Sequence, residues 1–162
     1  MEYKALLIFC FILLYRDSQG ASCPHGWTSH ALSCYVFIED LLIDFTESTS
    51  FCNRLQGKLV EIESADENNF IRNYLLHNTT HKQNFWIGGT DAVFENEWRW
   101  MSTLEKMEFT DWSPNQPDNY MSHQDCAMFF LPDNYHWNDH YCDVKAGYIC
   151  EREIEEGSSV IG

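Results

Sequence analysis

The sequence predicts an α+β domain that disulfide bonds hold together. Two stretches with helical periodicity lie in the first half of the chain, and several short aromatic strands lie in the second half. Seven cysteines are present, and six of them follow an apolar N-terminal segment. An even number of cysteines in an exported chain indicates a disulfide framework. The 162 residues are enough for one domain and too few for two of ordinary size.

The first helix is expected over residues 45–56, after a short strand at Cys34–Phe37. Apolar residues at positions 45, 51, 52 and 55 form one helical stripe. Gly57 is expected to end this helix, because glycine is common just after helix C-termini. The alternating stretch Lys58–Ile62 then predicts a strand.

The second helix is expected to begin at Ser64 and to end near His77. Ser64 and Glu67 have the spacing of a capping box, and apolar residues follow on one face. Asn78-Thr79-Thr80 is an N-glycosylation sequon, so we expect Asn78 to lie in an exposed loop and to be glycosylated.

Short aromatic or apolar strands are expected in the second half. They are predicted at Phe85–Gly88, Trp98–Trp100, Cys126–Phe130 and Tyr148–Glu151. A long irregular segment, residues 102–124, separates the second of these strands from the third. Segments of this length are usually disordered or functional. Phe109, Trp112 and Tyr120 within it argue against disorder, so we expect an ordered, functional loop.

The N-terminus has the layout of a secretory signal peptide. A short charged start precedes the apolar run ALLIFCFILLY, and small residues follow at Ser18 and Gly20. A membrane anchor is the alternative, but a spanning helix needs roughly 20 apolar residues and this run is about half as long. We predict a signal peptide over residues 1–20, a mature domain over 21–154 and a flexible tail over 155–162, in a secreted, extracellular protein without membrane insertion.

Acidic residues dominate the charge of the chain. There are 25 Asp and Glu against 10 Lys and Arg, which gives a formal net charge of −15. Residues 1–20 hold two charges of each sign, so their removal leaves this charge unchanged. The balance argues against nucleic acid and anionic membranes as partners. It leaves two alternatives open, a surface that favours solubility and a surface that binds cations.

Metal and enzyme motifs are weak. The close C-x-x-C pairs of zinc ribbons are missing. His136 and His140 have the i, i+4 spacing of a zinc protease helix, but the glutamate that such a site needs between them is absent. Since no other catalytic grouping stands out, we do not expect an enzyme. Six cysteines allow fifteen pairings, and their spacing does not choose among them. The even number argues that any homo-oligomer is non-covalent.

Four motifs, taken in order, resemble those of the C-type lectin-like domain. They are CPHGW at Cys23, FWIGG at Phe85, WSPNQPDN at Trp112 and WND at Trp137. The resemblance covers nearly all of the mature chain. It implies two helices, short antiparallel sheets and a long irregular loop that binds calcium and sugar. It also implies the disulfide pairs Cys23–Cys34, Cys52–Cys150 and Cys126–Cys142.

The resemblance implies a principal calcium site made of side chains that carry oxygen. These are Gln116, Asp118, Gln124, Asn138 and Asp139. Ca²⁺ takes six to eight such oxygens and accepts irregular geometry. Pro117 is expected to follow a cis peptide bond, which would turn Gln116 and Asp118 toward the same ion. A second calcium site would use Asp91, Glu95 and Asp125, for which solvated surface acids are the alternative.

The motif Gln116-Pro117-Asp118 is similar to the Gln-Pro-Asp of the family's galactose readers, whereas its mannose readers carry Glu-Pro-Asn. The resemblance therefore implies galactose or GalNAc glycans as partners, through hydroxyls that join the calcium shell. The implied sugar-binding residues are Gln116, Asp118, Tyr120, Gln124 and Asn138, with Tyr120 stacking on the sugar. A merely exposed loop residue is the alternative for Tyr120. Gln124 departs from the pattern, because the family's sugar binders have glutamate there. The smaller ligand charge predicts weaker calcium binding.

Two functions remain open at this point. One is a secreted, calcium-dependent lectin, with pattern recognition of glycans in innate immunity as its role. The other is a module of the same fold that binds a protein or a mineral surface with a weak or absent calcium site. Four of the five implied ligands match the family pattern, which favours the lectin.

Overall fold

A computed structural model gives the arrangement of residues 22–154. The strands are β1 Thr28–His30, β2 Ser33–Ile43, β3 Lys58–Leu59, β4 Phe85–Thr90, β5 Arg99–Trp100, β6 Cys126–Phe130, β7 His136–His140 and β8 Ala146–Glu153. All of them belong to one sheet with the order β1-β2-β8-β4-β6-β7, in which β3 also pairs with β8 and β5 pairs with β4. The pairs are antiparallel except β4 with β8, which run parallel.

The helices α2, Phe45–Arg54, and α3, Ala65–His77, cover opposite faces of this sheet. Alternate side chains of β4 show why both faces are buried. Phe85 and Ile87 pack into a core cluster with side chains of α3, whereas Trp86 packs into a second cluster with side chains of α2. The two helices and the sheet confirm the predicted α+β class.

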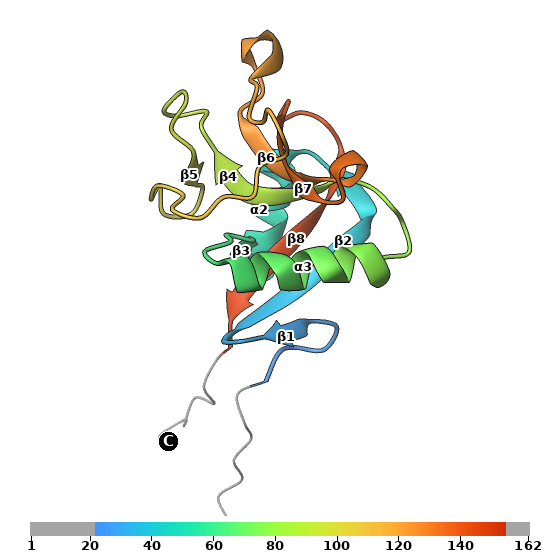
Figure 1. The fold of residues 1–162 in the computed structure, drawn as a ribbon. Coiled ribbons are helices and arrows are strands. Elements are labelled where there is room, and N and C mark those ends of the chain that lie inside the picture. The colour runs from blue at the N-terminus through green and yellow to red at the C-terminus, as the bar shows by residue number, and fades with distance from the viewer. Residues whose placement is uncertain (1–21, 155–162) are drawn as a thin grey trace, which may run out of the picture.

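The ends of the described chain and the tip of the long loop lie at opposite poles of the molecule (Figure 1). The pairing of β2 with β1 and β8 brings both ends of the described chain to one pole. The 3₁₀ turn η1, Tyr120–Ser122, lies at the opposite pole, and a second 3₁₀ turn, η2, spans Leu131–Asp133. The predicted signal peptide over residues 1–20 and the tail over 155–162 lie outside the described residues.

Both predicted helices are present, with one correction at the end of the first. α2 begins with a reciprocal capping box between Asp44 and Glu47, and it ends at Arg54. Gln56, and not Gly57, takes the left-handed conformation after the helix, with φ of 59°. Gly57 is needed for space, because a Cβ there would collide with the carbonyl oxygen of Glu151.

Ser64 begins α3 as predicted, and the helix ends at His77. The capping box is only half formed. The Ser64 hydroxyl accepts from the N–H of Glu67 at 3.2 Å, but the Glu67 carboxylate bonds the hydroxyl of Tyr35 and the N–H of Glu63 instead.

The observed strands lie close to the predicted positions, but several differ from the prediction in length. Cys126–Phe130 is correct, whereas β2 continues from Phe37 to Ile43 with a register shift after Ile38. The predicted strand Lys58–Ile62 is only two residues long. β1 was not predicted, because three residues carry too little pattern.

Three disulfides join the pairs that the family resemblance implies. They are Cys23–Cys34, Cys52–Cys150 and Cys126–Cys142, with Cα atoms 5.5, 5.3 and 5.3 Å apart. The second joins α2 to β8, and the third joins β6 to the turn after β7. Among residues 22–154, no helix has the length and apolar content that crossing a bilayer requires.

Candidate functional site

The long loop between β5 and β6 is fixed against β7 before it reaches its tip. The N–H of Trp137 donates to the carbonyl oxygen of Asp111 at 2.8 Å, and the N–H of Ser113 donates to that of Trp137 at 2.7 Å. These bonds place residues 114–119 beside Asn138 and Asp139, whose side chains are buried. The sequence motifs WSPNQPDN and WND are thereby brought together.

The Asp139 carboxylate holds the loop and the strand together. It is fully buried and accepts from the backbone N–H groups of Asp118 at 3.2 Å and of Asn119 at 2.6 Å. Burial raises the pKa of the Asp139 carboxyl, and these two N–H donors oppose that rise. The peptide bond between Gln116 and Pro117 is cis, as predicted.

Gln124 closes the other side of the loop. Its side-chain oxygen accepts from the N–H of Tyr120 at 2.7 Å, and the same N–H lies 3.2 Å from Oδ1 of Asp118. The side-chain oxygen of Gln116 accepts from the N–H of Asp118 at 3.1 Å. Asn138 is buried and donates its amide to the carbonyl oxygen of Asp139. The five residues predicted for the principal site therefore form one connected group.

This group is suited to a hard cation. Its side chains provide carboxylate and amide oxygens, which are the ligands that Ca²⁺ prefers. Among residues 22–154, no Lys, Arg or His forms an ion pair with Asp118 or Asp139. A buried carboxylate without a positive partner is unfavourable. A bound cation would supply that partner.

The acids predicted for the second site lie near one another. Asp91 is buried, and its Oδ2 accepts from the N–H of Asn96 at 3.0 Å, whereas its Oδ1 has no hydrogen-bond partner. Burial raises the pKa of Asp91 to about 6, the N–H of Asn96 opposes this, and the charges of Glu95 and Asp125 add to it.

The partnerless oxygen of Asp91 also fits a cation, but the acids do not suffice alone. In the described part of the chain, no three His, Cys, Asp or Glu side chains are grouped so that they could hold a metal ion. A cation beside Asp91 would therefore need amide or backbone oxygens as well.

Asn119 connects the two groups, although the sequence motifs did not predict it as a site residue. Its amide donates to Oε1 of Glu95 at 2.5 Å, and its side-chain oxygen accepts from the N–H of Gln124 at 3.1 Å. Its φ of 43° is left-handed, a conformation that asparagine adopts more readily than most residues. Its position directly after the Gln-Pro-Asp motif is the feature of the sequence that could have indicated a role in the site.

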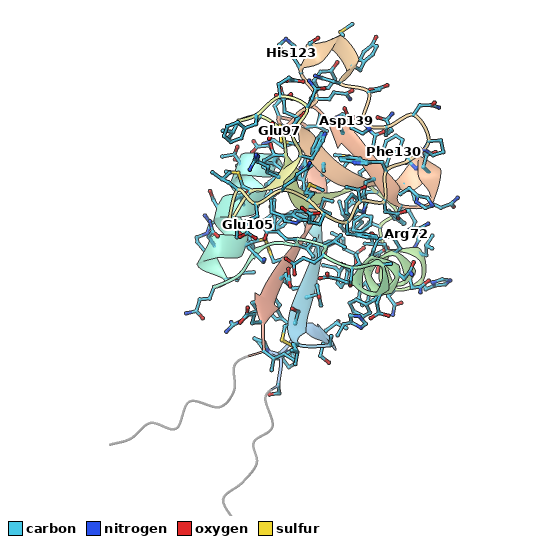
Figure 2. The ribbon with its side chains drawn as sticks, turned by 60° about the vertical axis from the view of Figure 1, so that its left-hand side comes forward. Arg72, Glu97, Glu105, His123, Phe130 and Asp139 are labelled. Atoms are coloured by element: carbon cyan, nitrogen blue, oxygen red, sulfur yellow. A yellow bond between two sulfur atoms is a disulfide. The ribbon has the colours of Figure 1, made fainter. Side chains whose placement is uncertain are left out.

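Tyr120 and His123 lie at the tip of the loop. Tyr120 is 56% exposed, so its ring is accessible beside the predicted calcium ligands. His123 is also exposed, and Figure 2 shows it at the far end of the molecule, beyond Asp139.

His136 and His140 lie at opposite ends of the strand β7 and not on a helix. His136 bonds Asp111 at 2.9 Å, whereas His140 accepts from the N–H of Tyr141. The two histidines therefore do not form the zinc protease arrangement that their spacing allowed.

Residues 42–152 match the sequence model of the Lectin C-type domain family. A perlucin-like protein from Mytilus galloprovincialis is 32% identical over 149 residues, which are 90% of this chain and 94% of the relative. The galactose-specific lectin nattectin from Thalassophryne nattereri is 32% identical over 134 residues, which are 83% of this chain and 82% of nattectin.

Solved structures share the fold. The C-type lectin CEL-I from Cucumaria echinata superposes with a TM-score of 0.75 at 26% identity, over 83% of this chain and 99% of CEL-I. A calcium-independent type II antifreeze protein also superposes, with a TM-score of 0.72 at 22% identity, over 83% of this chain and 96% of its own. The latter likeness concerns the fold alone.

Proposed function

This chain belongs to the C-type lectin domain family, and on that basis we propose that it is a calcium-dependent lectin for glycans that end in galactose or GalNAc. One observation carries this proposal. The loop and β7 bring Gln116, Asp118, Gln124, Asn138 and Asp139 into one hydrogen-bonded group around a buried carboxylate that has no positive partner.

We propose that these five side chains hold Ca²⁺. When bound, calcium supplies a centre that two neighbouring sugar hydroxyls can coordinate. The chain itself orients the sugar, because amides donate hydrogen bonds to the hydroxyls and carboxylates accept from them. Asp91, Glu95 and Asp125, with Asn119, are proposed as a second calcium site.

The galactose preference rests on the order of amide and acid. Gln116 can donate and Asp118 can only accept, which is the reverse of the Glu-Pro-Asn order. The likeness to nattectin, which is named galactose-specific, supports the same preference. Tyr120 is exposed one residue after Asn119, where its ring can cover the apolar face of the sugar.

We further propose that the protein is secreted after removal of residues 1–20, that residues 21–154 form the lectin domain and that residues 155–162 form a flexible tail. Pattern recognition of glycans outside the cell is the proposed role. Asn78 follows the last residue of α3 and is exposed together with Thr80, so the sequon is accessible to glycosylation.

A glycan array, probed with calcium and again with a chelator, tests the proposal. We expect binding to galactose and GalNAc termini that chelation abolishes. The double substitution Gln116→Glu with Asp118→Asn should shift the ranking toward mannose, and both sugars must be measured because specificity is a difference of affinities. Asp66→Asn, which changes an exposed acid on α3, serves as the matched control.

Binding that is equal in calcium and in chelator would contradict the calcium mechanism. It would favour the second candidate, a protein or mineral surface as ligand. Gln124 is the observation in favour of that candidate, because its neutral amide already bonds the N–H of Tyr120 and removes one negative charge from the group. An unchanged sugar ranking in the double variant would show that the loop does not read the sugar.

A further inference from the structure

The tip of the long loop exposes neighbouring apolar side chains beside the proposed sugar site. Tyr120 is 56% exposed and Met121 is 69% exposed, and both belong to η1. Tyr141, just after β7, lies against the same turn, since its hydroxyl donates to the carbonyl oxygen of Tyr120 over 3.5 Å. We call Tyr120, Met121 and Tyr141 the tip patch.

The backbone at this tip has a conformation that favours glycine, although the tip contains none. Asn119, Met121 and Ser122 have φ of 43°, 58° and 57°. A left-handed residue with a side chain costs roughly 1–2 kcal/mol. Glycine at position 121 would remove this cost and an exposed apolar side chain together. Such strain is often kept where a side chain has a functional role.

The tip patch is attached to the residues proposed to bind sugar. The N–H of Tyr120 donates to Asp118 at 3.2 Å and to Gln124 at 2.7 Å. The tip patch is therefore one wall of the proposed site. A group attached to the sugar on the η1 side would therefore contact an apolar surface.

We propose that the tip patch is a subsite for an apolar group attached to the terminal sugar, so that this lectin selects glycosides with an apolar aglycone. The inference rests on the proposed function and deepens it. Met121 fits this role because its flexible thioether adapts to irregular partners and packs well against rings. The stretch Asn115–Cys126 contains no lysine or arginine, which disfavours an anionic group as the occupant.

The test is calorimetry in calcium with two pairs of ligands, methyl and phenyl β-galactoside and methyl and phenyl α-mannoside. For the sugar that binds, we expect the phenyl glycoside to bind about 5- to 10-fold more tightly than the methyl glycoside, as burial of part of a ring predicts. Met121→Gly should reduce this preference to below about 3-fold, because it removes the apolar side chain while glycine accepts the positive φ.

Leu104→Gly is the matched control. Leu104 is also exposed, at 43%, and also has a positive φ, of 60°. It lies in the turn after β5, and its neighbour Glu105 is far from His123 at the tip (Figure 2). This variant should keep the full preference for the phenyl glycoside.

Equal affinity of the wild type for methyl and phenyl glycosides would overturn the subsite and leave the proposed lectin function intact. An unchanged preference in Met121→Gly would overturn it as well. A change of oligomeric state in that variant, with an unchanged preference, would assign the tip patch to contact between copies of the chain. If only mannosides bind, the galactose preference is wrong. The comparison of phenyl with methyl α-mannoside then tests the subsite. If no glycoside binds, the lectin function fails and the subsite with it.

Discussion

The half of the molecule that contains α2, α3, β2 and β8 differs from the half that contains residues 91–125. The first is stabilised by side chains that bury apolar surface on both faces of a sheet. The second has few regular hydrogen bonds between strands. It depends on side chains such as Asp91, Gln124 and Asp139, which accept from backbone N–H groups.

Backbone conformation shows the same difference. Among residues 22–154, ten residues other than glycine have a positive φ, and six of these lie within residues 91–125. They are Asn96, Leu104, Asn115, Asn119, Met121 and Ser122. Apolar burial explains the first half. The second half also contributes Trp100 and Met107 to the core, but its loops depend in addition on polar contacts that a bound cation would strengthen. The two halves should therefore respond differently to the same perturbation.

The largest effect is expected from the disulfides. Removing Cys52–Cys150 with two alanines frees a loop of 98 residues and should lower the free energy of unfolding by about 4–5 kcal/mol. Removing Cys126–Cys142, which closes 16 residues at the base of the site, should cost about 3 kcal/mol. Chemical denaturation measures both. A larger loss for the second pair would show that the loop half, and not the sheet, limits stability.

Asn68→Ala should have the next largest effect, because Asn68 connects the two halves. From α3 its amide donates to Asp111 at 2.7 Å, and its oxygen accepts from the Trp137 indole at 3.0 Å. Alanine leaves both groups without this partner, and we expect a loss of about 2–3 kcal/mol in denaturation. The exposed neighbour Asn69→Ala is the control. Equal losses for the two variants would contradict the connecting role of Asn68.

Gln124→Glu should change calcium binding more than folding. A third carboxylate beside Asp118 and Asp139 should tighten calcium by on the order of 10-fold, from a wild-type site near 10⁻³ M. At limiting calcium, sugar affinity should rise with it by linkage. Calorimetry of calcium and then galactose on both forms checks this. Unchanged calcium affinity would remove residue 124 from the proposed coordination group.

Asp44→Ala should have the smallest effect and should act only on the helical half. Loss of the N-cap of α2 should lower the free energy of unfolding by about 1 kcal/mol at neutral pH. Hydrogen bonds from Lys145 and from the N–H of Glu47 lower the pKa of Asp44 below 3.8. Its contribution is therefore present above pH 3.8 and lost as the pH falls through the lowered pKa.

Denaturation of Asp44→Ala at several pH values, beside the exposed control Asp143→Ala, tests this. A deficit that persists unchanged at pH values below the pKa of Asp44 would contradict the cap. Calcium affinity should equal that of the wild type in both variants.

The two halves also differed in how far the sequence could predict them. Helix periodicity and the Ser64 cap predicted α3 to its last residue, because local pattern and burial agree there. The end of α2 was placed wrongly, because Gly57 is selected by contact with the distant Glu151, which local sequence does not reveal. The continuation of β2 to Ile43 was missed, because residues 39–42 lie outside its regular pairing and are exposed or half-buried.

In the loop half, family resemblance predicted what pattern could not. The resemblance implied the cis peptide before Pro117 and the approach of Asp118 to Asp139, which lies 21 positions further along the chain. No periodicity in the loop indicates that contact. Asn119 was missed because its contacts with Glu95 and Gln124 appear only after both loops have folded.

The two ends of the described chain lie on the side of the molecule that is opposite the proposed site. The N–H of Ile154 donates to the carbonyl oxygen of Leu32 at 2.9 Å, so the described chain begins and ends at the pole opposite η1. A multimerising scaffold fused at either end would therefore display every copy of the loop outward. Linked copies gain avidity without any new contact where the geometry allows them to bind at the same time, so such a fusion is a suitable reagent for testing the proposed glycan binding.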